Sequence, residues 1–326
     1  MADNPSLLPS EQPPEILQSH MEMEMKKLKK IDCLLLELLF EILSYLPVKS
    51  LLRFMCFPSH FGSCNGLVCL LCQADDVMLL NPATRACKNL LKVKLTNKYM
   101  QLCTPLGFGY DCITNDYKVL RCARLRMPNA GIPEWETLLY SFRSNSWVII
   151  QKPPWSWETV RLSPGIVANN SLHWMDHERK KIKCFDLFSQ RYYEIPLHEK
   201  ISPGNSSNLC VLRGQLCIVT TFYFDTWILK EYGVHDSWTR LFHCPSGEWS
   251  RLYNSFSSWH TGLSVACSKD GSKILVALRG DPPNFICCDL KSKKVVKILI
   301  PGLPPQCPFI LPWVESLVPL PDDVMN

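Results

Sequence analysis

The chain has 326 residues, of which 47% are hydrophobic and 20% are charged, and its formal net charge is +5. This composition is typical of a globular protein and excludes the disordered, low-complexity and collagen-like classes. The 35 basic and 30 acidic residues are spread over the whole length, which argues against nucleic acid as the main partner. The length allows one large domain or two unequal ones.

The cysteines and the apolar runs indicate where such a chain resides. Seventeen cysteines are many, but the number is odd and the spacings are irregular, so we expect free thiols. The N-terminus lacks the basic start and apolar run of a signal peptide. The most apolar run, residues 34–46, is shorter than the ~20 residues that span a bilayer. We therefore expect no membrane contact and a cytoplasmic or nuclear location.

The first 58 residues divide into a flexible and a helical part. Residues 1–30 have no apolar period and predict a flexible N-terminal segment, whose lysine cluster is typical of a solvated helix turn. From Ile31 onward, apolar residues recur at steps of three and four, which predicts an amphipathic helix that ends at Pro47. A second short helix is expected from Val48 to Pro58, because proline stops both.

After Ser63 the helical period gives way to short apolar runs bounded by turn residues, which predicts a mostly β domain over residues 63–320. One hairpin type recurs five times, and its turns open at Asn81, Ser141, Asp186, Tyr232 and Asp289, with spacings of 60, 45, 46 and 57. Kelch-like blades repeat every ~40 to 50 residues, so this domain predicts a β-propeller of about six blades. A two-sheet sandwich is the alternative, although five copies of one hairpin speak against it.

Three residue groups resemble metal or redox sites, and each has a structural explanation. Cys64, Cys69 and Cys72 lack a second cysteine pair, and strand alternation would place the last two on opposite faces. The second group is His173, Asp176 and His177, for which packing and solvent contact are the better explanation. The third is the pair Cys287 and Cys288, which is typical of a buried strand start because adjacent residues point to opposite faces.

The common catalytic motifs do not occur in the sequence. We find no Gly-rich phosphate loop, GxSxG elbow, HExxH or EF-hand pattern, and therefore expect no cofactor, no metal and no enzymatic activity. A propeller enzyme is the less favoured class. Basic turns such as residues 178–183 and 291–294 are typical of solvated charge, and a basic recognition surface is the weaker alternative.

Two parts of the chain resemble one plant family. The segment LLLELLFEILSYLPVKSLLRFMC (34–56) resembles the opening of an F-box. The longer part, from Ser63 onward, resembles the plant F-box-associated domain of the Kelch-like interaction type. The motifs that carry this resemblance occur in family order: SCNGLVCL (63–70), LLNPATR (79–85), GFGYD (107–111), DYKVLR (116–121), SFRSNSW (141–147), SLHW (171–174), CFDL (184–187), EIPL (194–197), VLRGQLC (211–217) and KEYGVHDSW (230–238).

The resemblance implies a non-catalytic substrate receptor of a Skp-cullin-F-box ubiquitin ligase. Its F-box helices would bind the Skp-type adaptor, and through it cullin, while the β-domain would bind a target protein for ubiquitination. Proximity alone then accelerates ubiquitin transfer. The adaptor contacts of the family carry over to Leu38, Leu39, Ile42, Leu43, Leu46, Pro47, Val48, Leu51 and Leu52.

The F-box of this chain departs from the family pattern. The usual opening Leu-Pro is Leu34-Leu35 here, and only the eight residues 55–62 separate Phe54 from Ser63. That interval is too short for the third F-box helix and a linker, given ~1.5 Å per helical residue. The sequence therefore predicts a truncated F-box over residues 31–58. A protein-binding propeller that has lost adaptor coupling is the alternative function.

Aromatic residues in or beside loops are the candidates for target binding. Propellers bind partners through loops on one face, and aromatic side chains are favoured anchors of interfaces. Packing between blades is an equally common role for such residues. The candidates are Trp135, Trp155, Trp157, Tyr223 and Trp227.

Overall fold

The computed structural model describes residues 61–71, 77–93, 100–125, 135–157, 160, 164–176, 181–201, 207–220, 225–244, 263–268, 272–278, 284–298 and 316–320. The chain divides into two compact units, residues 1–50 and 51–326, and all described residues belong to the second. The predicted flexible segment 1–30 and the predicted truncated F-box 31–58 lie outside the described residues. The three predicted domain boundaries therefore stay predictions.

The described strands form five antiparallel sheets of four consecutive strands each, which we call blades 1 to 5. Blade 1 contains β1 (Phe61–Cys64), β2 (Leu67–Leu71), β3 (Val77–Asn81) and β4 (Ala86–Asn89). Blade 2 contains β5 (Met100–Asp111), β6 (Asp116–Leu125), β7 (Trp135–Ser141) and β8 (Ser146–Ile150). Blade 3 contains β9 (Ile166–Ala168), β10 (Ser171–Asp176), β11 (Lys181–Asp186) and β12 (Tyr192–Pro196). Blade 4 contains β13 (Asn208–Leu212), β14 (Gln215–Thr220), β15 (Asp225–Leu229) and β16 (Trp238–His243), and blade 5 contains β17 (Leu263–Cys267), β18 (Lys273–Leu278), β19 (Asn284–Asp289) and β20 (Val295–Ile298).

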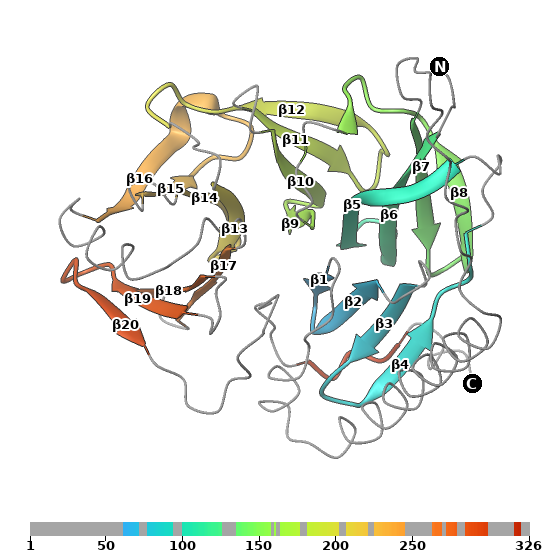
Figure 1. The fold of residues 1–326 in the computed structure, drawn as a ribbon, viewed down its shortest axis with the longest axis horizontal. Helices are drawn as coiled ribbons and strands as arrows, with labels where there is room; N and C mark the ends of the chain where they lie inside the picture. The colour runs from blue at the N-terminus through green and yellow to red at the C-terminus, as the bar shows by residue number, and fades with distance from the viewer. Residues whose placement is uncertain are drawn as a thin grey trace, which may run out of the picture. The chain divides into compact units, whose positions relative to one another are not determined.

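The blades adjoin one another through their first strands, which Figure 1 shows nearest the centre of the array. β1 contacts β5, β5 contacts β9, β9 contacts β13, and β13 contacts β17. The first strands run parallel, as the parallel bridge between Gly107 and Gly165 shows for blades 2 and 3. This arrangement confirms the predicted β-propeller and excludes the two-sheet sandwich.

The predicted number of about six blades is corrected to five within the part of the chain that the structure describes. The first strands begin at Phe61, Met100, Ile166, Asn208 and Leu263, so successive blades begin 39, 66, 42 and 55 residues apart. Blade 2 occupies the longest stretch of the chain because β5 and β6 have 12 and 10 residues, about twice the usual strand length. A uniform period of ~40 to 50 residues therefore overestimates the count.

The recurring hairpin of the sequence is the connection between the third and fourth strands of each blade. Asn81, Ser141, Asp186 and Asp289 are the last residues of β3, β7, β11 and β19, and Tyr232 lies in the turn after β15. Asp289 shows why these residue types occur there, because its carboxylate Oδ1 accepts hydrogen bonds from the backbone N–H groups of Lys291 and Ser292 at 3.0 and 2.7 Å.

Four of these turns share one backbone conformation, in which the fourth residue after the opening residue has a positive φ. The φ angles are 64° at Arg85, 48° at Asn145, 55° at Gln190 and 59° at Lys293. The left-handed region favours glycine and asparagine, so only Asn145 matches the usual preference. The backbone conformation therefore does not explain why Arg85, Gln190 and Lys293 occur at this position.

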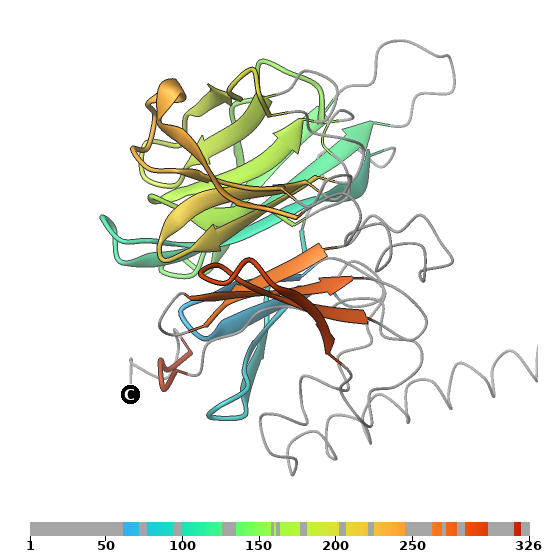
Figure 2. The same ribbon diagram turned by 90° about the vertical axis from the view of Figure 1, so that its left-hand side faces the viewer.

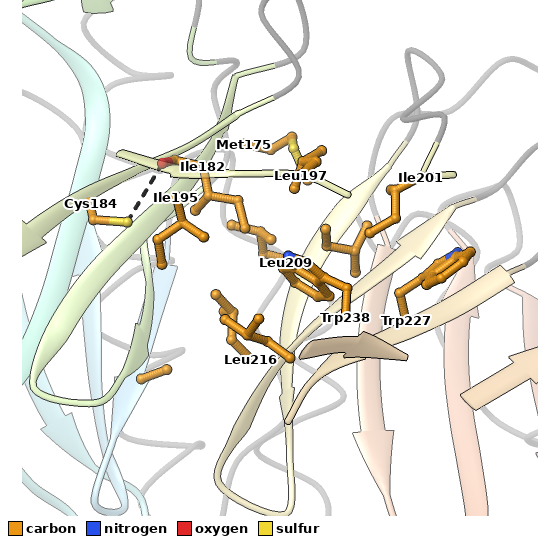
Figure 3. Close-up of a cluster of buried hydrophobic side chains, with 13 residues drawn as sticks. Met175, Ile182, Cys184, Ile195, Leu197, Ile201, Leu209, Leu216, Trp227 and Trp238 are labelled. Atoms are coloured by element: carbon orange, nitrogen blue, oxygen red, sulfur yellow. Dashed lines mark hydrogen bonds between the residues drawn. The ribbon is translucent and has the colours of Figure 1, made fainter. Parts of the chain in front are cut away.

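Hydrophobic clusters fill the junctions between neighbouring blades. The cluster between blades 3 and 4 is drawn in Figure 3, where Ile182, Leu209 and Trp238 converge from three strands. Equivalent clusters lie between blades 1 and 2, blades 2 and 3, and blades 4 and 5. Apolar burial of about 25 cal/mol per Å² makes these junctions the main source of stability.

Two further findings concern membrane-spanning helices and the state of the cysteines. Within the described residues, no helix is long and apolar enough to cross a membrane. The cysteines whose side chains are described are free thiols, which agrees with the expectation from their irregular spacing.

Candidate functional site

The turns of all five blades gather at one end of the propeller. In an antiparallel four-stranded blade, the turns after the first and third strands lie at the same end, and the parallel first strands align these ends. We call this end the turn face, and Figure 2 shows it on the left. Its described residues are 65–66, 82–85, 112–115, 142–145, 169–170, 187–191, 213–214, 230–237, 268, 272 and 290–294.

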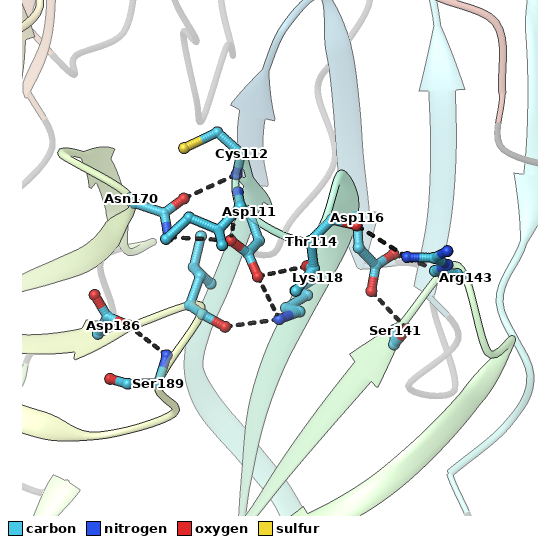
Figure 4. A network of polar contacts seen from close by, with 12 residues as sticks. Asp111, Cys112, Thr114, Asp116, Lys118, Ser141, Arg143, Asn170, Asp186 and Ser189 are labelled. Carbon is cyan, nitrogen blue, oxygen red and sulfur yellow. Dashed lines mark hydrogen bonds and ion pairs between the residues drawn. The ribbon is translucent and has the colours of Figure 1, made fainter.

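A buried polar network fixes the turn face where blades 2 and 3 meet (Figure 4). Asp111, at the end of β5, is fully buried and pairs with Lys118 of β6, with 2.8 Å between carboxylate Oδ2 and Nζ. Lys118 also donates to the backbone carbonyl of Leu187 at 2.7 Å. Asn170 Nδ2 donates to Asp111 Oδ1 at 3.1 Å, and Asn170 Oδ1 accepts from the backbone N–H of Cys112 at 2.9 Å. The turns of the two blades are thereby held in one geometry.

The network determines the ionisation of Asp111. Burial by itself would raise the pKa of this carboxyl, but hydrogen bonds from Lys118, Thr114 and Asn170 outweigh it. The pKa of Asp111 is consequently held well below its usual range, so the group is a carboxylate at neutral pH.

A second buried chain of polar groups links blade 3 to blade 4. His173 of β10 is fully buried, and its Nδ1 lies 3.1 Å from the carbonyl oxygen of Ile166, which can only accept. Nδ1 therefore carries the proton, and Nε2 accepts from the hydroxyl of Tyr232 at 2.5 Å. Tyr232 is also hydrogen-bonded to Tyr193. Burial lowers the pKa of His173 to about 4, so this histidine is neutral and structural.

This low pKa predicts acid sensitivity near neutral pH. The folded-state pKa lies below the unfolded value of about 6.5, so protonation of the unfolded chain removes stability as pH falls from 6.5 towards 4. We expect His173 to account for a loss of about 2 kcal/mol between about pH 7 and pH 5. Urea unfolding of His173→Gln at both pH values should show a correspondingly smaller loss than the parent, whatever its baseline stability. An equal pH dependence in the two proteins would contradict the assignment.

Two of the aromatic residues predicted to bind a target lie inside the propeller. Trp157 is 1% exposed and packs edge-to-face on Trp174, and Trp227 is 7% exposed in the cluster between blades 3 and 4. Both therefore have the packing role that is the alternative interpretation of such residues. Their assignment to a target surface stays a prediction.

The other three candidates differ from these and from one another. Trp135 is half-buried at the start of β7, with the Arg124 guanidinium 5.8 Å from its ring centre. Trp155 is half-buried with Lys183 Nζ 5.2 Å from its ring centre, and Lys183 is also paired with Asp176 at 3.0 Å. Tyr223 lies outside the described residues. Their role in target binding also stays a prediction.

The residues with metal-like spacing have other surroundings. Cys69 is buried and Cys64 half-buried against the cluster between blades 1 and 2, and burial raises the pKa of the Cys64 thiol to about 11. Asp176 forms the ion pair with Lys183, and Cys72 and His177 lie outside the described residues. Among the described side chains, no group of three His, Cys, Asp or Glu residues is placed to hold a metal ion.

The sequence interpretation named residues 291–294 as part of a less favoured basic recognition surface, but it missed how exposed side chains are distributed over the whole turn face. Each of blades 2, 3 and 4 places one large apolar side chain at a turn: Ile113, 60% exposed; Phe188, 50% exposed; and Val234, 46% exposed. Exposed cations lie around them on all five blades. They are Arg85, Arg143, Arg191, Arg213, Lys230, Lys291, Lys293 and Lys294. The residues that make up this pattern come from separate blades, so no local sequence signal could reveal it.

Five antiparallel four-stranded blades, with apolar and charged side chains at their turns, place the described part of the chain in the class of β-propeller domains. Residues 23–320 match the F-box associated beta propeller domain, and the chain belongs to this family. The predicted resemblance to the plant family is thus confirmed, while the truncation of the F-box stays a prediction.

Several curated proteins of Arabidopsis thaliana are similar to the chain. F-box protein CPR1 is 29% identical over 277 residues, which cover 75% of this chain and 64% of that protein. F-box protein At4g22390 is 28% identical over 268 residues, covering 73% and 64%, and F-box protein At3g07870 is 28% identical over 281 residues, covering 74% and 66%. The chain spans about two thirds of the length of these relatives.

Proposed function

We propose that the chain is the substrate-recognition subunit of a Skp-cullin-F-box ubiquitin ligase, in which the propeller binds the target protein and residues 31–58 bind the Skp-type adaptor. Membership of the F-box associated propeller family is the observation that carries this proposal. Such domains are non-catalytic receptors, and the chain's share of the reaction is to hold a target lysine near the charged conjugating enzyme.

The turn face supports the receptor role in physical terms. Interfaces need a preformed surface with apolar anchors and a polar rim, because ordering flexible groups on binding costs affinity. The buried Asp111 network and the His173 network fix turns of blades 2, 3 and 4 before any partner arrives. These hydrogen bonds between blades support a preformed binding surface on the turn face.

The adaptor surface gives the direct test of the ligase proposal. Replacing Leu43 by aspartate places a charge in the apolar surface that the family uses for the adaptor, so we expect binding to a purified Skp-type adaptor to weaken about 100-fold or more. Titration calorimetry with the full chain measures this. Ser44→Asp introduces the same charge at the next residue, on another face of the predicted helix, and is expected to bind like the parent. Equal binding by Leu43→Asp would contradict the proposed surface.

A propeller without adaptor coupling is the second candidate function. The observation that favours it is the interval of eight residues, 55–62, where the family has a third F-box helix. A variant given a complete third helix distinguishes the candidates in the same titration. Adaptor binding by the native chain supports the ligase receptor, whereas binding by the extended variant alone supports the uncoupled propeller.

A further inference from the structure

The turn face is far more basic than the chain as a whole. The sequence has 35 basic and 30 acidic residues, a nearly even balance. On the turn face, eight lysine and arginine side chains are exposed, whereas the exposed acidic side chains among its described residues are Glu231 and Asp236. Four further carboxylates at its border are buried or half-buried and accept hydrogen bonds from backbone N–H groups of the turns: Asp111, Asp116, Asp186 and Asp289. The excess positive charge therefore faces solvent.

Apolar side chains are interspersed with these cations. Ile113 and Phe188 belong to adjacent turns, which the Asn170 side chain and backbone connect through hydrogen bonds of 2.9 and 3.0 Å. Val234 lies between the third and fourth strands of blade 4, as Phe188 does in blade 3. Leu317, 80% exposed, belongs to the C-terminal segment that is bonded to Asn81 at the turn of blade 1. Singly exposed apolar residues are normal, but here four blades carry one at the same end of the propeller, and those of blades 2 and 3 belong to hydrogen-bonded turns.

We propose that the turn face binds an acidic segment of the target protein whose apolar side chains alternate with its carboxylates. This inference rests on the proposed receptor function and names the chemistry of its target. Carboxylates of the segment would approach Arg143, Arg191 and the lysines of residues 291–294, while its apolar side chains would cover Ile113 and Phe188. Positive charge around apolar anchors steers such a partner and fixes its register.

The same charge could attract single-stranded RNA, but the side chains favour a protein segment. Binding of single-stranded nucleic acid relies on aromatic platforms on which bases stack. Phe188 is the exposed large aromatic residue that the described turn face offers, and its other exposed apolar residues are aliphatic. Aliphatic side chains provide no stacking plane, whereas they pack well against the apolar side chains of a peptide.

A displayed library of random short peptides, sorted on the full chain, tests this proposal. We expect the selected peptides to be enriched in Asp and Glu with intervening Leu, Ile or Phe. The variant Arg143→Glu/Arg191→Glu/Lys291→Glu should bind them at least about tenfold more weakly, mainly through a slower association that depends strongly on salt. Phe188→Ala should weaken binding about tenfold through faster dissociation, with little salt dependence.

A reversal of two charges away from the turn face is the control. Lys152 and Lys200 are exposed and lie after β8 and β12, and Lys152→Glu/Lys200→Glu is expected to bind the selected peptides like the parent. All substituted side chains are exposed, so the variants should unfold at the parent's temperature.

Three results would overturn the proposal: no acidic enrichment, equal binding by the turn-face variant, or turn-face binding of oligouridylate but of no acidic peptide. The adaptor titration with Leu43→Asp is independent of this experiment. A failure of the proposed receptor function can therefore be distinguished from a failure of the acidic-segment proposal.

Discussion

Replacing Asp111 by asparagine is expected to lower the free energy of unfolding by about 3–5 kcal/mol. The substitution keeps the shape of the side chain but removes the charge that pairs with Lys118 across 2.8 Å. The Asp111 and Lys118 side chains are 0% and 6% exposed, so water cannot replace the lost partner. An unpaired buried ammonium is the dominant cost, and urea unfolding at neutral pH measures it.

Two further variants separate the charge effect from simple loss of a hydrogen bond. Asp111→Asn/Lys118→Met removes both charges and should recover much of the lost stability, because an apolar pair avoids the desolvation penalty. Asp236→Asn changes a carboxylate whose side chain is 89% exposed and should shift stability by less than about 0.5 kcal/mol. A loss below about 1 kcal/mol in Asp111→Asn would show that the pair contributes little.

The same pair has a defined pH dependence. The pKa of Asp111 is depressed in the folded state, so its stabilisation is complete above the unfolded value of about 3.9 and is lost as pH falls below it. The His173 contribution changes between about pH 6.5 and pH 4. The two groups therefore act in different pH ranges. In Asp111→Asn, the loss of stability that Asp111 causes below about pH 3.9 should be absent from the acid unfolding curve.

The hairpin turns could be predicted from sequence because their chemistry is local. Asp186 and Asp289 accept hydrogen bonds from N–H groups two or three residues ahead, and such residues mark turns in any fold. Asn81 and Ser141 accept in the same way, so four of the five recurring hairpins carry this signal, and their repetition predicts a propeller. The number of blades could not be predicted in this way, because β5 and β6 are unusually long and the repeat is uneven.

The contacts between blades could not be predicted, because they join residues far apart in the chain. Asp111 and Asn170 are separated by 59 positions, and Asp111 occurs in a family motif without any sign of its partner. Burial of Trp157 and Trp227 likewise depends on how the blades pack. Solvent exposure of a basic residue in a turn can be predicted one turn at a time, but the collection of these residues on one face requires the fold.

Removing the C-terminal segment 316–320 is expected to cost blade 1 about 3–5 kcal/mol. The fully buried side chain of Asn81, 235 positions before Ser316, donates to the carbonyls of Ser316 and Val318 at 3.1 and 2.6 Å. Leu320 is 3% exposed in the cluster between blades 1 and 2. Gly66 has φ +80°, and a Cβ there would lie 2.2 Å from Ser316 Cβ, so the segment lies directly on this turn.

A double-mutant cycle tests whether Asn81 acts through this segment. Asn81→Ala in the full chain should cost about 2–4 kcal/mol, since it removes donors to two carbonyls as well as the acceptor for the N–H groups of Ala83 and Thr84. In a chain ending before Ser316, the same substitution should cost at least about 1 kcal/mol less. Asn89→Ala, exposed on β4 of the same blade, is the matched control and should change neither protein measurably. Equal costs of Asn81→Ala in both chains would mean that Asn81 stabilises its own turn alone, and that the C-terminal segment is held to blade 1 by the burial of Leu320 instead.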